Sequence, residues 1–203
     1  MKRQKINFLL LGMSLILVGC AVLPKVYVSP DFKGQDLKRI GILGFEGPAT
    51  YGEYVTDIFT AELLKRLGGD YEIVGKNLLI TALKVEGIER GDIKRLGKTL
   101  SLDAIVVGSI GEYGYHREGK SGVSLGWAWD DVDKKGVIIA QEGSSELPAV
   151  ALSVQLLDVE SSKILFSASY AKRMGYGYSV GKLVEEMVER IAKSFKEVIE
   201  ENR

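Results

Sequence analysis

The chain reads Leu102-Asp-Ala-Ile-Val-Val-Gly-Ser-Ile110 at its centre. This run is short, mostly apolar and rich in β-branched residues, which is the composition of a strand buried inside a sheet. A second run of the same kind, Arg39-Ile-Gly-Ile-Leu-Gly-Phe45, is followed closely by Gly and Pro. The two runs predict two buried strands, and the fold depends on what lies between and after them.

Residues 54–67 lie between the two strands and follow the periodicity of a helix with one apolar face. The stripe consists of Val55, Ile58, Phe59, Leu63, Leu64 and Leu67. A pair of glycines then ends the helix, and residues 71–74 form a short run typical of a strand. Asn77 and Asp92 are candidate N-cap residues of two further helices.

The C-terminal part of the chain predicts a hairpin and a long helix. Residues 149–159 and 163–170 read as two strands that turn at residues 160–162. Residues 180–199 then carry an unbroken apolar stripe, which most often packs on a protein core and less often receives a partner helix. The order strand, helix, strand, helices, strand, hairpin, helix predicts an α/β fold, a mixed-sheet α/β sandwich.

The N-terminus has the pattern of a secretory signal peptide. Three cations within the first five residues precede an apolar run over residues 8–18. A membrane-spanning helix needs about 20 apolar residues, and this run has only eleven. The run ends in the tetrapeptide Leu17-Val18-Gly19-Cys20, which resembles the bacterial lipobox and contains the only Cys of the chain.

The lipobox resemblance implies a covalent lipid on Cys20. The thiol accepts a diacylglyceryl group, cleavage before Cys20 removes residues 1–19, and the new N-terminus is acylated. Each buried acyl CH₂ contributes about 0.8 kcal/mol, so several chains hold the protein at a membrane. Ala21 and Val22 follow in place of the Asp of many inner-membrane lipoproteins. We therefore expect a protein that is lipid-anchored in the outer membrane and faces the periplasm.

The sequence divides into three parts. Residues 1–19 form the signal peptide, residues 20–36 a lipidated tether, and residues 37–203 the α/β domain, with a Gly-rich hairpin insertion at 113–148. Fully extended, residues 21–36 span at most about 50–58 Å, and residues 26–28 are a candidate for a short added strand. Loss of the signal peptide leaves 24 of the 27 cations against 27 acidic residues, a net charge of −3. The lipid must therefore supply the attachment to an anionic membrane.

The composition excludes several functional classes. With 27 Lys+Arg against 27 Asp+Glu, the chain lacks the basic excess expected of a nucleic-acid-binding protein. One Cys and one His do not suffice for a zinc site of the usual kind. Asp130, Asp131 and Asp133 lack the turn Gly and the closing Glu of a calcium loop. We therefore expect no nucleic-acid partner, no metal, no cofactor and no catalytic residue.

One motif argues for an enzyme. The stretch Gly114-Tyr-His-Arg-Glu-Gly119-Lys120-Ser121 matches the pattern of the phosphate-binding loop. That loop acts at the N-terminus of a helix. Here the residues that follow, 122–129, alternate between apolar and small residues as a strand does. A Gly-rich hairpin tip is the better interpretation, and the expectation of a non-enzyme stands.

The insertion contains an alternating stretch with apolar residues at Val123, Leu125, Trp127 and Trp129. Strands that cross a membrane show such an alternation but take about 9–11 residues, and the clean alternation here covers seven. Two interpretations remain open. The hairpin inserts in a membrane, or it stays in water and its aromatic patch contacts other proteins or other copies of the chain.

Three stretches occur in an order that points to a known family. They are residues 39–45 before a helix, residues 102–110 after short helices, and Val154-Gln-Leu-Leu-Asp158-Val-Glu-Ser-Ser-Lys-Ile-Leu165 as a closing hairpin. Together with the lipobox they resemble the CsgG family of bacterial envelope lipoproteins, which is itself similar to the LpoB-like activators. The likeness covers roughly residues 37–170 and the last helix.

The resemblance implies a periplasmic α/β domain on an outer-membrane lipid anchor, which assists assembly or export of envelope components as in curli secretion. Its partners would be envelope proteins and, in a homo-oligomeric ring, further copies of itself. CsgG subunits form export channels with two hairpins each. Here the insertion at 111–148 is long enough for a membrane hairpin, whereas the one at 171–179 is short. A pore-forming channel subunit and an LpoB-like activator of a penicillin-binding protein remain alternatives.

Overall fold

In the computed structural model, the apolar run at the centre of the chain forms strand β4 (Ala104–Arg117). Ile105 and Val106 are buried, as expected of a strand with a neighbour on each side and cover on both faces. Strand β2 (Arg39–Glu46) pairs with β4 in parallel, and β7 (Glu146–Asp158) pairs with it antiparallel. The two strands predicted first from the sequence are therefore neighbours in the sheet.

The structure describes residues 23–33, 36–117, 122–130, 135–143, 146–174 and 179–202. The other elements are β1 (Lys25–Val28), the 3₁₀ helix η1 (Pro30–Phe32), α2 (Ala49–Leu67), β3 (Glu72–Val74), α3 (Lys76–Val85), α4 (Ile93–Leu100), β5 (Gly122–Asp130), β6 (Lys135–Gly143), β8 (Ile164–Arg173) and α5 (Val180–Glu201).

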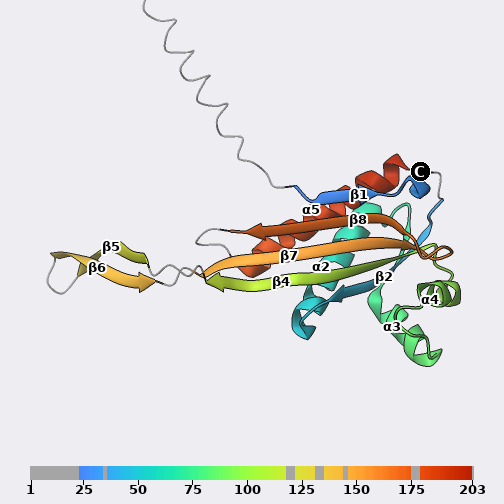
Figure 1. The fold of residues 1–203 in the computed structure, drawn as a ribbon, viewed down its shortest axis with the longest axis horizontal. Coiled ribbons are helices and arrows are strands. Elements are labelled where there is room, and N and C mark those ends of the chain that lie inside the picture. Colours follow the sequence, from blue (N-terminus) through green and yellow to red (C-terminus); the bar gives the residue numbers. More distant parts are fainter. Residues whose placement is uncertain are drawn as a thin grey trace, which may run out of the picture.

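Within the described residues, six strands form one mixed sheet in the order β1-β8-β7-β4-β2-β3. β2 is parallel to β3 and β4, whereas β4–β7, β7–β8 and β8–β1 are antiparallel pairs. β5 and β6 pair with each other in a separate two-stranded sheet. Figure 1 shows this hairpin beyond the ends of β4 and β7. The α/β fold with a mixed sheet that the sequence predicts is confirmed.

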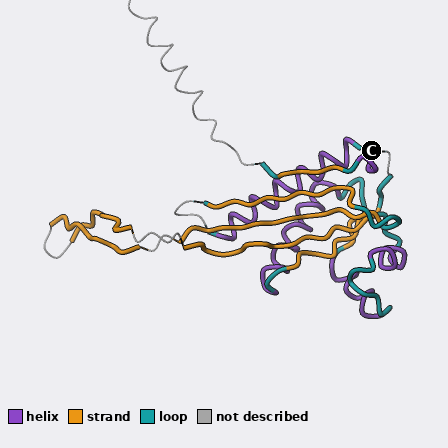
Figure 2. The backbone as a smooth tube through the Cα atoms, viewed as in Figure 1, coloured by secondary structure: helices purple, strands orange, loops and turns teal. Residues whose placement is uncertain are grey.

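Helices α2 and α5 cover one face of the sheet, as the tube in Figure 2 shows. The apolar stripe of α5 packs into the larger core, so the predicted core role of this helix is confirmed. Phe195 of α5 makes edge-to-face contacts with Phe59 of α2, at 6.5 Å between ring centroids, and with Phe166 of β8, at 5.1 Å. These aromatic contacts join both helices to the sheet.

Helices α3 and α4 pack on the opposite face, beside β2 and β4. Leu79 of α3 and Leu96 of α4 are fully buried there against Leu43 and Ile105, whose neighbours along the strands face the larger core. Asp92 caps α4 as predicted, because its carboxylate accepts a hydrogen bond from the Arg95 N–H. The α3 N-cap is Gly75, so Asn77, the predicted cap, lies inside the helix instead.

Strand β1 brings part of the predicted tether into the domain. Its register pairs Lys25 with Ser169 and Val28 with Phe166 of β8. Phe32 follows in η1 and is 1% exposed within the larger core. The folded domain therefore begins at β1, twelve residues earlier than the start at residue 37 that the sequence suggested.

Candidate interaction surface

The lipobox residues Leu17, Val18, Gly19 and Cys20 lie outside the described residues. The described chain begins at Leu23, and β1 follows two residues later. Leu23 is 68% exposed, and Tyr27 of β1 is 56% exposed. The segment closest to the predicted lipid therefore presents apolar side chains to its surroundings along the edge of the sheet.

The residues of the predicted contact hairpin, Val123, Leu125, Trp127 and Trp129, occupy alternate positions of β5. The structure describes them by backbone and register, which places them opposite positions 142, 140, 138 and 136 of β6. All nine residues of β5 are paired in this register, two more than the clean alternation in the sequence. A strand of nine residues is about 30 Å long.

The hairpin of β5 and β6, called the ribbon below, follows directly from the two central strands of the domain. The register of β4 and β7 runs to Arg117 opposite Glu146, past the end of β8 at Arg173, which pairs with Ala149. It also runs past Glu46, the last residue of β2. β4 and β7 therefore leave the sheet as a pair, and the ribbon lies beyond their ends in Figure 1.

The match to the phosphate-binding loop lies partly outside the described residues. Its first four residues, Gly114 to Arg117, are the end of β4, and residues 118–121 are not described. The next described residue, Gly122, begins strand β5. Because a strand follows the motif, it lacks the helix N-terminus at which such a loop holds phosphate.

A shallow groove lies on the sheet face that α3 and α4 occupy, in the part formed by β4, β7, β8 and the chain before β1. Ser109, Ser153 and Ser169 lie in register across three strands, and the Oγ atoms of Ser109 and Ser153 are 2.8 Å apart. The cavity measures about 450 Å³ and is lined by Leu23, Lys25, Ser109, Gly111, Ala151, Leu152, Ser153, Ser169, Tyr170 and Ala171. Small side chains leave this part of the sheet open.

Aromatic side chains gather near the point where the ribbon leaves the domain, on the sheet face that α2 and α5 cover. Tyr51 of α2 stacks on Tyr113 of β4 with ring centroids 3.8 Å apart, and Tyr51 remains 40% exposed. Tyr54 donates a long hydrogen bond of 3.5 Å to Glu185 of α5. Burial, followed by the charge of Glu185, raises the pKa of the Tyr54 hydroxyl, which therefore stays protonated at neutral pH.

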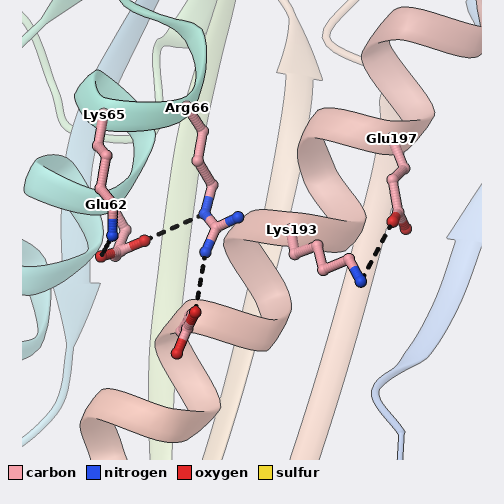
Figure 3. Close-up of polar contacts among 6 residues, drawn as sticks. Glu62, Lys65, Arg66, Lys193 and Glu197 are labelled. Carbon is pink, nitrogen blue, oxygen red and sulfur yellow. Dashed lines mark hydrogen bonds and ion pairs between the residues drawn. The ribbon is translucent and has the colours of Figure 1, made fainter.

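Ion pairs join the solvent sides of α2 and α5. Arg66 binds Glu62 of its own helix at 3.0 Å (Figure 3). It also binds Glu189 of α5 at 3.2 Å. Glu186 of α5 forms ion pairs with Lys172 of β8 at 2.8 Å and with Arg190 of its own helix at 2.9 Å. The hydrogen bond from Lys172 is the main cause that lowers the pKa of Glu186.

The part of the chain that the structure describes contains no group of three His, Cys, Asp or Glu residues arranged to hold a metal ion. None of the described helices is both long and apolar enough to cross a membrane.

The sequence located the ribbon, but it revealed neither the groove with its row of serines nor the stack of Tyr51 on Tyr113. Part of the serine row had a signal, because Ala149, Ala151 and Ser153 alternate with larger apolar residues up to Val154. The Tyr51–Tyr113 stack had none, because its two rings come from positions 62 residues apart and meet only through packing.

No family model matches the chain, and no curated protein matches it in sequence. Solved structures do match. PelC from Paraburkholderia phytofirmans, solved as a dodecamer, is 13% identical with a TM-score of 0.50, and the match covers 84% of this chain and 96% of that one. At this identity the likeness shows a shared fold.

Two bacterial proteins with lower TM-scores are also similar. The lipoprotein GNA1162 from Neisseria meningitidis is 20% identical with a TM-score of 0.49, covering 77% of this chain and 99% of that one. The C-terminal domain of LpoB from Salmonella enterica is 12% identical with a TM-score of 0.37, covering 79% and 92%.

Proposed function

We propose that the chain is a lipoprotein of the CsgG type, anchored in the outer membrane, that faces the periplasm and has no catalytic role. It assists assembly or export of envelope components, in the manner of curli secretion, through contacts with envelope proteins and with copies of itself. Cys20 fixes the location, and the ribbon with Trp127 and Trp129 supplies contacts.

The observation that carries the proposal is the position of Cys20. It is the only Cys of the chain, it ends an apolar run of signal-peptide length, and the three residues before it complete a lipobox. Self-association is supported by the fold shared with PelC, which was solved as a dodecamer. The quoted stretches that resemble the CsgG family fold into β2, β4 and the β7–β8 hairpin, neighbours in one sheet.

Metabolic labelling with a clickable fatty acid tests the anchor. The full chain expressed in a bacterium with two membranes should carry the label and sediment with outer membranes. Cys20→Ser should lose the label and leave the membrane fraction, because a hydroxyl does not replace the thiol. Ala21→Ser, a change of similar size at the next residue, should keep both. An unlabelled wild-type protein in the cytosol would end the proposal.

A second candidate function, a channel subunit, is supported by the ribbon. Its nine paired residues reach the lower limit of about 9–11 for a membrane-crossing strand. A channel predicts stepwise conductance when the lipidated protein is added to a planar bilayer. Replacing residues 118–145 by a short turn should abolish the conductance. A lipidated protein that binds the bilayer without conducting would contradict this candidate and leave the anchored scaffold intact.

A further inference from the structure

The chain before β1 runs toward the end of the sheet from which the ribbon projects. β1 is antiparallel to β8, with Lys25 opposite Ser169, so the residues before Lys25 continue toward the C-terminal end of β8. Leu23 accordingly lines the groove together with Ala151 and Ala171, beyond the level of Lys25. The path toward Cys20 is therefore fixed by described contacts as far as Leu23.

The reach of the chain sets where a lipid on Cys20 can lie. Cys20 is three residues from Leu23, a distance of at most about 11 Å when fully extended. The other end of the sheet, where β8 begins at Ile164, is seven strand residues from Ala171, or about 23 Å. The lipid therefore cannot reach the β7–β8 turn and must attach nearer the ribbon.

The two ends of the sheet also differ in chemistry. At the turn end, Lys163 pairs with Asp31 at 2.7 Å, and Glu160 lies within 4 Å of Lys94 and Lys98. All these side chains are at least half exposed, and charged groups of this kind are costly to move out of water. The ribbon end carries the exposed pair of Arg173 and Glu112, 3.9 Å apart, but the segment nearest the anchor contributes the apolar and exposed Leu23. The turn end suits water, and the segment next to the anchor suits a lipid interface.

We propose that the domain stands upright on the membrane, with its strands directed along the membrane normal, the ribbon end against the phospholipid surface and the β7–β8 turn farthest from it. The inference rests on the lipid anchor proposed above. It goes beyond the anchor by assigning a lipid-facing surface to the folded domain, and it places Trp127 and Trp129 on the side of the bilayer.

Energy transfer to the membrane measures this orientation. Glu160→Cys at the turn, Ser169→Cys in the middle of β8 and Arg173→Cys at its end each introduce one free thiol, because the lipid occupies Cys20. A donor dye is attached to the purified full-length lipoprotein bound to phosphatidylcholine vesicles with a rhodamine-labelled lipid. The upright domain predicts transfer that is several-fold higher from residue 173 than from residue 160, with residue 169 between them.

Vesicle flotation separates the inference from the anchor on which it rests. If the protein floats with the vesicles but residues 160 and 173 transfer equally, the domain lies flat or tumbles, and the upright orientation is overturned while the anchor stands. A reversed order also overturns it. If the protein does not float, both proposals fail.

A measurement without any substitution guards against a variant that folds poorly. Trp127 and Trp129 are the only tryptophans of the chain, so emission excited at wavelengths selective for Trp reports the ribbon alone. Vesicles of brominated phosphatidylcholine should quench this emission in the bound wild-type protein. Unchanged emission, in a protein that floats with the same vesicles, contradicts contact between the ribbon end and the lipid.

Discussion

Thr56 joins the end of β2 to the first turns of α2 through one hydroxyl. Its Oγ1 accepts a hydrogen bond from the Phe45 N–H at 2.9 Å and donates one to the Gly52 carbonyl at 2.6 Å. Thr56 is 1% exposed, so water cannot replace either partner. A methyl group of the same size could make neither of these hydrogen bonds.

Thr56→Val should lower the free energy of unfolding by about 1–3 kcal/mol, because it leaves a buried backbone N–H without an acceptor. Urea denaturation followed by circular dichroism measures the loss. Thr81→Val is the matched control, since the Thr81 hydroxyl also donates to a helix carbonyl, at 2.8 Å, but on an exposed surface. Its effect should stay within about 0.5 kcal/mol. Equal losses in the two variants would contradict the role assigned to Thr56.

Glu186 gives the fold a dependence on acid pH. Lys172 and Arg190 hold the folded-state pKa of Glu186 below its ordinary value of 4.5. Ionised Glu186 therefore adds to the free energy of unfolding above pH 4.5, and this stabilisation is lost as the pH falls through the lowered pKa. Wild type should therefore be more stable than Glu186→Gln at pH 7, and the difference should close below pH 4.5. Denaturation curves across pH 3–7 measure it.

The matched control for Glu186 lies on the solvent side of the same helix. Glu197 pairs with Lys193 at 3.8 Å, and both side chains are more than half exposed (Figure 3). Exposed pairs of this kind contribute at most about 1 kcal/mol. Glu197→Gln should therefore change the free energy of unfolding little at pH 7, where Glu186→Gln lowers it. A difference for Glu186→Gln that stays constant down to pH 3 would contradict the proposed linkage.

At the scale of elements, α4 approaches the end of β7 through Gly97. A Cβ built at Gly97 would overlap the Cβ and both Cγ atoms of Val159. Gly97→Ala should therefore destabilise the protein by about 1–3 kcal/mol through overpacking, despite the higher helix propensity of Ala. Gly91→Ala, at a site with open space around the added methyl, is the control and should be close to neutral. Thermal unfolding of both variants measures the effect, and equal stability would refute the close contact.

The sequence predicted those elements whose signal is local. β2, β4 and α5 each carry a long apolar pattern, and the hairpin turn at residues 160–162 has polar residues between two such patterns. The sequence indicated a short strand at residues 26–28, but four residues without a clear alternation do not reveal that they pair with the edge formed by β8. Its register is decided by tertiary contacts such as the burial of Phe32.

The candidate surfaces divide in the same way. Alternation alone located Trp127 and Trp129, since neighbours along one strand define that pattern. The groove with Ser109, Ser153 and Ser169 depends on the alignment of three strands, two of them more than 40 residues apart in the sequence. A single sequence does not contain that register, so the groove emerged only from the fold.

At the scale of the whole molecule, the ribbon and the domain should unfold separately. Within the described residues, β5 and β6 pair only with each other, and an isolated two-stranded hairpin is marginally stable in water. In the Cys20→Ser protein, the Trp emission should therefore not follow the cooperative urea transition seen by circular dichroism. As a control, Tyr170→Trp in a Trp127→Phe, Trp129→Phe background should follow it, because Tyr170 lies in the larger core. Coincident curves for the native tryptophans would show that the ribbon packs on the domain.

The antiparallel pairing of β1 with β8 has a mechanical consequence for a tethered protein. Tension on the N-terminus directed along the strands loads the hydrogen bonds that join residues 25–28 of β1 to β8. These bonds are loaded together, in shear, so they must rupture at the same time. A pull across the sheet would instead peel them open one after another from Lys25. If the anchor proposed on Cys20 pulls along the strand axis, it therefore meets more resistance than a pull across the sheet, and β1 would carry the force between lipid and domain.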